Sequence, residues 1–101
     1  MKNEKPKEKM PRYQIDISDE AEEDFEKIWY YLLDNDFDLG IIRKIRTGID
    51  KRLSERPENN LKTRNGTYKI LILRKNVVYY EIIGKTVRIL RVFAGKMNKD
   101  I

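Results

Sequence analysis

Residues 68–93, YKILILRKNVVYYEIIGKTVRILRVF, decide the fold of this chain. They contain three runs rich in β-branched and aromatic residues with two short breaks between them: 68–74, 77–83 and 87–93, broken at Lys75-Asn76 and at 84–86. Such runs are typical of strands. The short breaks predict tight hairpins, and Gly84 supplies the positive φ that a turn between right-twisted antiparallel strands needs. The sequence therefore predicts a three-stranded antiparallel meander.

The residues before the meander predict one strand and two helices. Residues 12–17 alternate apolar and polar side chains, which is the pattern of a half-buried strand. Ser18 can cap a first helix that ends near Asn35, and Asp38 can cap a second that ends before Pro57. Each helix has an apolar stripe spaced by three and four residues: Ala21, Phe25, Ile28 and Leu32 in the first, and Ile42, Ile45, Ile49 and Leu53 in the second.

The predicted order, βααβββ, belongs to the α+β class because two consecutive helices cannot each cross over between parallel strands. We expect an antiparallel helical hairpin on one face of the sheet. Gly48 either is tolerated because tertiary packing holds the second helix or allows the two helices to approach closely. The strand 77–83 is apolar on both faces, so its face away from the helices is expected to meet a partner protein.

Composition limits the other possibilities. The 101 residues suffice for one domain, predicted at 12–101, after a disordered charged tail at 1–11 that has no apolar run for a signal peptide or membrane span. The chain has no cysteine, which excludes disulfides and thiolate metal sites and suggests the cytoplasm. We expect no metal, no cofactor and no membrane contact.

Charge is distributed unevenly along the chain. The residues up to Asp38 include 6 basic and 12 acidic side chains, whereas those from Leu39 onward include 16 basic and 5 acidic ones. A basic half of this density suits contact with a polyanion or an acidic protein, although it is equally compatible with an ordinary solvated surface. The second helix is expected to turn a cationic face to solvent: Arg43, Lys44, Arg46, Lys51 and Arg52.

Two side chains have structural interpretations that compete with functional ones. Arg91 is expected on the face of its strand that Ile89 and Phe93 share, where an ion pair with Glu81 across the strands is favoured over target contact. Trp29 lies beside the apolar stripe of the first helix and is expected to pack within the hairpin.

Short motifs in this order resemble the RelE/ParE superfamily of toxins. The first half of the resemblance consists of a strand, a helix pattern and an Arg-Pro stop: Tyr13-Gln-Ile-Asp-Ile-Ser18, Ala21-x-x-Asp24-x-x-x-Ile28-Trp29-x-Tyr31 and Arg56-Pro57. The second half lies in the meander and after it: Tyr68-Lys69, Val78-Tyr79-Tyr80, Ile89-Leu90-Arg91-Val92-Phe93 and Met97-Asn98. The resemblance extends from about residue 12 to the end and implies the growth-arresting half of a type II toxin–antitoxin pair.

The superfamily has two branches with different chemistry. RelE-type members are ribosome-dependent messenger-RNA endonucleases that use clustered Lys and Arg, whereas ParE-type members poison DNA gyrase and have no accepted hydrolytic site. Lys69 matches one basic position of the RelE pattern, but Leu71, Val77 and Met97 stand at others. With no histidine, a neutral-pH acid–base pair is also missing, so the chain is more similar to the ParE branch.

The resemblance implies partners and candidate residues. The expected partners are a cognate antitoxin in a hetero-oligomer and, as target, DNA gyrase; the alternative target is the ribosome with its messenger RNA. The target-binding candidates lie at the end of the last strand and after it: Arg91, Lys96, Met97 and Asn98. If the chain were instead a ribonuclease, its catalytic candidates are basic residues: Lys62, Arg64, Lys69 and Lys96.

Overall fold

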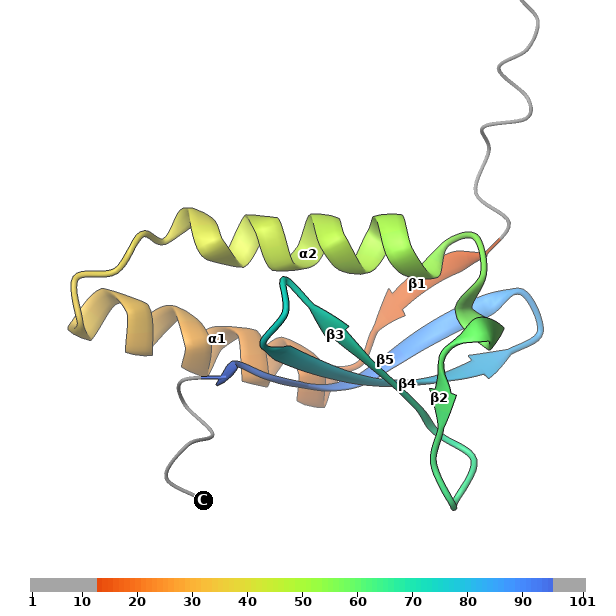
Figure 1. The fold of residues 1–101 in the computed structure, drawn as a ribbon. Helices are drawn as coiled ribbons and strands as arrows, with labels where there is room; N and C mark the ends of the chain where they lie inside the picture. Colours follow the sequence, from red (N-terminus) through yellow and green to blue (C-terminus); the bar gives the residue numbers. More distant parts are fainter. Residues whose placement is uncertain (1–12, 96–101) are drawn as a thin grey trace, which may run out of the picture.

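The structure, a computed structural model, describes residues 13–95 and has the predicted α+β architecture (Figure 1). The predicted tail at 1–11 lies outside the described residues. The elements follow in this order: β1 (Gln14–Ile17), α1 (Asp19–Asp34), α2 (Gly40–Leu53), a 3₁₀ helix (Pro57–Asn59), β2 (Leu61–Lys62), β3 (Tyr68–Ile72), β4 (Asn76–Ile83) and β5 (Thr86–Phe93). The prediction of one strand, two helices and a meander is therefore confirmed.

All five strands of the described chain form one sheet in the order β1-β5-β4-β3-β2. The three strands of the meander are antiparallel, as predicted, while β1 pairs with β5 in parallel and makes the sheet mixed. The connector at 58–67, predicted as a loop, also contains the short strand β2, which pairs with β3 through Leu61 and Lys62. One face of the sheet is covered by the helices, α1 packing against β5 and α2 against β3.

Local hydrogen bonds fix where the helices begin. The side-chain oxygen of Ser18 accepts a hydrogen bond from the backbone N–H of Ala21 at 3.1 Å, which caps α1 as predicted. The predicted cap of the second helix is one residue too early, because α2 begins at Gly40 after the N-cap Leu39, which makes no side-chain cap hydrogen bond. Asp38 still supports this end of the helix, because its Oδ1 accepts from the N–H of Gly40 at 2.9 Å. Pro57 begins the 3₁₀ helix after α2 and marks the predicted stop.

Gly48 provides a close approach, but to the sheet rather than to α1. A Cβ atom at this position would lie 2.7 Å from Cγ2 of Ile72 on β3. The interpretation that Gly48 brings the two helices together is therefore wrong, because the glycine faces β3. The core lies between the helices and this face of the sheet and includes Phe25, Ile28, Ile45, Ile49, Ile72, Val78, Tyr80, Ile89 and Val92.

The hairpin between β3 and β4 turns earlier than predicted. Residues 73–75 form the turn, so the break at Lys75-Asn76 is placed wrongly and Asn76 already pairs with Ile72. Leu73 and Arg74 have φ values of 56° and 70°, in the left-handed region that side chains other than glycine rarely adopt. The side chain of Asn76 stabilises the turn by donating from Nδ2 to the carbonyl oxygen of Ile72 at 3.0 Å.

A β-bulge in β5 changes which side chains face the helices. Tyr79 lies opposite Arg91 and Tyr80 lies opposite Ile89, so Leu90 is an extra residue on β5. The alternation of faces is interrupted there: Ile89 is buried, while Arg91 is exposed. Arg91 consequently does not share a face with Ile89, contrary to the prediction from strict alternation.

Candidate functional site

The face of the sheet away from the helices is the first candidate surface, because no described element covers it. The registers place two rows of side chains across it: Lys69, Tyr79 and Arg91 in one, and Leu71, Val77 and Phe93 in the other. Leu71 is 52% exposed, and the rings of Tyr79 and Phe93 contact edge to face with centroids 5.9 Å apart. This apolar and aromatic surface is the feature that the two-sided middle strand predicted.

Arg91 reaches from this surface to helix α1 instead of to Glu81. Its Nε and Nη2 donate to the two carboxylate oxygens of Asp24 at 2.8 and 3.0 Å, a bidentate geometry that is stronger than a single contact. Its guanidinium also lies 4.8 Å from the centre of the Phe93 ring. The predicted pair with Glu81 is wrong because Glu81 lies opposite Arg88, while the bulge brings Arg91 to α1.

Asp24 is a buried carboxylate that binds the backbone of β5 beyond the end of β1. It is 5% exposed, and its Oδ2 also accepts a hydrogen bond from the backbone N–H of Val92 at 2.8 Å. Strand β1 ends at Ile17, and beyond it the N–H of Ser18 donates to the carbonyl oxygen of Ile89 at 3.0 Å. Beyond the end of β1, the N-cap and first turns of α1 thus provide hydrogen-bond partners of β5. The hydrogen bonds to Asp24 also raise the pKa of Arg91.

The ribonuclease candidates do not gather at one point in the described chain. Lys69 lies on the uncovered face, with its Nζ 6.0 Å from the centre of the Tyr79 ring. Lys62 lies opposite Tyr68, whose ring its Nζ approaches to 5.5 Å, and so belongs to the opposite face of the sheet. Arg64 is exposed in the turn between β2 and β3. Lys96, Met97 and Asn98 lie outside the described residues.

Tyr80 is a core residue that ties the connector after α2 to the sheet. Its hydroxyl donates to the carbonyl oxygen of Pro57 at 2.6 Å and accepts from Nδ2 of Asn60 at 2.9 Å. Its ring stacks on that of Tyr68 with centroids 5.3 Å apart. Burial raises the pKa of the Tyr80 hydroxyl, and the hydrogen bond from Asn60 opposes that shift.

The outer side of the helical hairpin is less uniformly cationic than predicted. Arg46 lies between the helices, where its Nη2 pairs with Oε1 of Glu22 at 2.9 Å and its guanidinium covers the ring of Phe25 at 4.1 Å. The other predicted members of the cationic face are exposed: Arg43, Lys44, Lys51 and Arg52. Trp29, predicted to pack within the hairpin, is 38% exposed and contacts Tyr30 edge to face.

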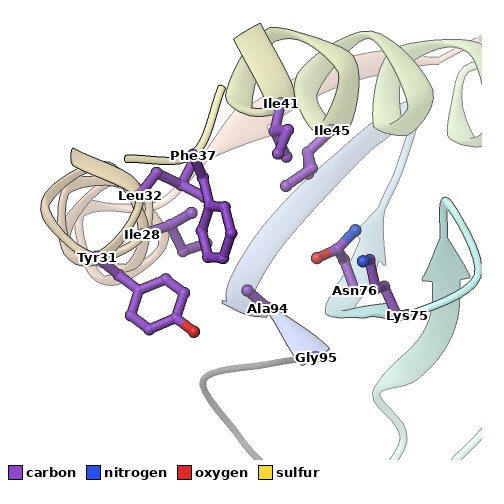
Figure 2. Close-up of a pocket in the computed structure, with 10 residues that line it drawn as sticks. All are labelled: Ile28, Tyr31, Leu32, Phe37, Ile41, Ile45, Lys75, Asn76, Ala94 and Gly95. Atoms are coloured by element: carbon purple, nitrogen blue, oxygen red, sulfur yellow. The ribbon is translucent and has the colours of Figure 1, made fainter. Parts of the chain in front are cut away.

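A second candidate site is an apolar cavity at the end of the hairpin, which sequence reasoning missed (Figure 2). Its volume is about 160 Å³, and it lies between α1, α2, the β3–β4 turn and the end of β5. The lining residues come from sequence segments far apart: Ile28, Tyr31, Leu32, Phe37, Ile41, Ile45, Lys75, Asn76, Ala94 and Gly95. No local sequence pattern predicts such a cavity, because it forms only when these segments meet in the folded chain.

Residues 13–95 contain neither a cluster of metal ligands nor a membrane-spanning helix. Among residues 13–95, no three Asp or Glu side chains gather closely enough to hold a metal ion. Within the same range, no helix has the length and apolar character needed to cross a bilayer.

Comparison with known proteins connects this geometry to a family. Residues 15–99 match the family model of the ParE toxin of type II toxin–antitoxin system, parDE. A sequence search of curated proteins gave no match. Among solved structures, the fold is similar to the chromosomal ParDE toxin–antitoxin system of P. aeruginosa, with a TM-score of 0.66, 16% identity, and coverage of 82% of this chain and 96% of that chain.

Two further structures share the fold. The toxin–antitoxin complex RelBE2 of Mycobacterium tuberculosis gives a TM-score of 0.64 at 21% identity, with 84% of this chain and 93% of that chain covered. A conserved hypothetical protein of Helicobacter pylori gives 0.56 at 18% identity, with 83% and 96% covered. At these identities the structures show a common fold, while the family model identifies the toxin family.

Proposed function

Because this chain belongs to the ParE toxin family of type II toxin–antitoxin systems, we propose that it arrests growth by binding and poisoning DNA gyrase in the cytoplasm. The observation that carries the proposal is the character of the uncovered sheet face. That face offers an apolar row, Leu71, Val77 and Phe93, beside Tyr79, which suits contact with a protein.

The same face lacks a converging set of cations in the described chain. An electrostatic ribonuclease needs several donors aimed at the charge that develops in its transition state. Lys69 faces this surface, but the guanidinium edge formed by Nε and Nη2 of Arg91 is directed at Asp24, and Lys62 belongs to the opposite face. These placements support inhibition by binding over messenger-RNA cleavage.

A cognate antitoxin is the second proposed partner. Free toxin exposes Leu71 at 52% and Leu73 at 47%, and burial of such side chains by an antitoxin segment would stabilise a hetero-oligomer. Co-expression with the antitoxin from the neighbouring reading frame is expected to give a complex that survives size-exclusion chromatography. Replacing Leu71 with Asp should weaken it, while Ile83→Asp, at an equally exposed strand end, serves as the control.

The proposed contacts with gyrase are Arg91 and the residues that follow β5: Lys96, Met97 and Asn98. The side chain of Arg91 keeps 44% of its surface exposed despite the contact with Asp24, so its outer edge remains accessible to a partner. Arg91→Lys would keep the charge but lose the bidentate geometry.

Pulse labelling after induction tests the proposal in cells. With gyrase as the target, thymidine incorporation should fall before methionine incorporation, and cells should form filaments and show a DNA-damage response. If codon-specific cuts in translated messages appear within minutes while DNA synthesis continues, the chain is a ribonuclease, and Lys62, Arg64, Lys69 and Lys96 become the residues to replace.

A further inference from the structure

The apolar cavity of Figure 2 lies where the described part of the chain ends. Ala94 and Gly95 form part of its wall, and Gly95 is the last residue described. The cavity volume of about 160 Å³ resembles that of an engineered apolar cavity of about 150 Å³ that binds benzene. One medium-sized apolar side chain can therefore occupy it.

Gly95 fixes the point from which the following residues depart. A Cβ atom at Gly95 would lie 2.7 Å from the carbonyl oxygen and 2.9 Å from Cβ of Lys75. The backbone at Gly95 is thus packed closely against the β3–β4 turn, at the rim of the cavity. The next residues must begin their path beside that rim.

The side chain of Asn76 offers a hydrogen-bond acceptor to an occupant of the cavity. Asn76 is 3% exposed, and the bond from its Nδ2 to the carbonyl oxygen of Ile72 fixes the orientation of the amide. Its side-chain oxygen is directed toward the cavity and Ala94 in Figure 2, and no donor within residues 13–95 reaches it. A buried acceptor without a donor destabilises a fold. The best occupant of the cavity therefore combines an apolar side chain with a backbone N–H that donates to Asn76.

We infer that Met97 of the same chain fills this cavity and that a backbone N–H of residues 96–98 donates to the side-chain oxygen of Asn76. Two residues span at most roughly 7 Å, so Met97 stays within reach of the cavity mouth beside Gly95. Methionine is unbranched and adapts to irregular apolar gaps. Lys96 and Asn98, its polar neighbours, are unsuited to the apolar lining.

Docking of Met97 has a consequence for its neighbours. Successive side chains point to opposite sides of a strand and lie roughly 100° apart around a helix, so in either conformation Lys96 and Asn98 point away from the cavity when Met97 enters it. This consequence rests on the proposed function, in which Lys96 and Asn98 contact gyrase. Met97 then acts as a positioning residue that holds these two side chains toward the target.

Methyl NMR of the full chain tests the docking directly. The chain has 3 methionines, so the Met97 methyl signal is identified by its disappearance in Met97→Leu. Docking predicts nuclear Overhauser effects from this methyl group to the ring of Phe37 and to Ile41. A narrow signal at a random-coil shift without these effects overturns the inference. Effects seen only between differently labelled molecules in a mixed sample also overturn it, because a second copy then fills the cavity.

Thermal unfolding gives an independent measure. Met97→Ala should lower the midpoint by about 4 °C or more, since even a modest loss of packing shifts the midpoint of a domain of this size by that amount. Met97→Leu should retain most of the stability. Met10→Ala, the same truncation in the N-terminal tail, should change nothing. Equal midpoints for Met97→Ala and the parent chain overturn the inference.

These measurements need no gyrase, so the two proposals can fail separately. A chain that docks Met97 but leaves gyrase unaffected refutes the proposed function and keeps the inference. A chain that poisons gyrase while the Met97 methyl group remains free supports the proposed function and refutes the inference.

Discussion

At the residue scale, Asp24 ties α1 to the end of β5. Its carboxylate accepts hydrogen bonds from the guanidinium of Arg91 and from the N–H of Val92, and its side chain is 6% exposed. Asp24 belongs to the helix pattern recognised in the sequence, but its partner Arg91 was not predicted. The bulge at Leu90 brings Arg91 to Asp24, and no sequence pattern in this strand indicates a bulge.

Replacing Asp24 with Asn should lower the free energy of unfolding by about 2 kcal/mol, because hydrogen bonds to a charged group typically contribute about 1.5–3 kcal/mol. Chemical denaturation measures the change. Glu26→Gln, an exposed carboxylate on the same helix, is the matched control and should leave the midpoint where it was. If both variants behave like the parent chain, the contact with Arg91 has no part in stability.

Tyr80 should make stability depend on pH in the alkaline range. Its pKa is raised above 10.0 in the folded state, chiefly by burial, so the folded chain retains a proton that the unfolded chain loses. The stabilising contribution is complete below pH 10 and declines as pH rises toward the folded-state pKa. Unfolding of Tyr80→Phe between pH 8 and 11 should show a weaker decline than the parent chain. An identical decline in both would assign the effect to other groups.

At the element scale, the contact between α2 and β3 depends on the missing side chain of Gly48. Alanine normally stabilises a helix by about 1 kcal/mol relative to glycine. Gly48→Ala should instead lower stability by about 1–3 kcal/mol, because the new Cβ would lie 2.7 Å from Cγ2 of Ile72. Thr47→Ala, on the exposed side of the same helix, should be neutral or stabilising.

A double-mutant cycle separates this clash from helix propensity. In an Ile72→Ala background the obstructing methyl group is gone, so Gly48→Ala should lose its penalty there. If the penalty persists, the cost belongs to α2 itself and not to its contact with β3.

Periodicity and capping predicted the elements well because they depend on neighbouring residues. Ser18, Pro57 and the two apolar stripes placed α1 and α2, and the meander followed from three β-rich runs. The β3–β4 turn was misplaced since Leu73 and Arg74 adopt positive φ without glycine, held by the side chain of Asn76. The short strand β2 was missed because only two of its residues pair.

At the scale of the whole molecule, the candidate site was predicted only in part. The two-sided apolar pattern of β4 correctly indicated an uncovered surface, because alternation along a strand is local information. The cavity beside Gly95 was not predictable, since residues from both helices, the β3–β4 turn and the end of β5 form its wall. The roles of Lys96, Met97 and Asn98 stay predictions, because these residues lie outside the described range.

The N-terminal tail should be dispensable. Residues 1–11 are dominated by Lys, Glu and Pro and have little apolar surface to bury. Deleting them is expected to leave the thermal midpoint and antitoxin binding unchanged. A midpoint lower by many degrees would show that the tail is part of the domain.

The most direct test of the central claim uses purified components. The chain is mixed with DNA gyrase, ATP and supercoiled plasmid, and linear DNA is measured after the enzyme is denatured and digested. Poisoning predicts that linear plasmid accumulates with added chain and that equimolar antitoxin abolishes it. Gyrase that supercoils normally at every concentration of the chain, while programmed ribosomes release cut messenger RNA, would contradict the account.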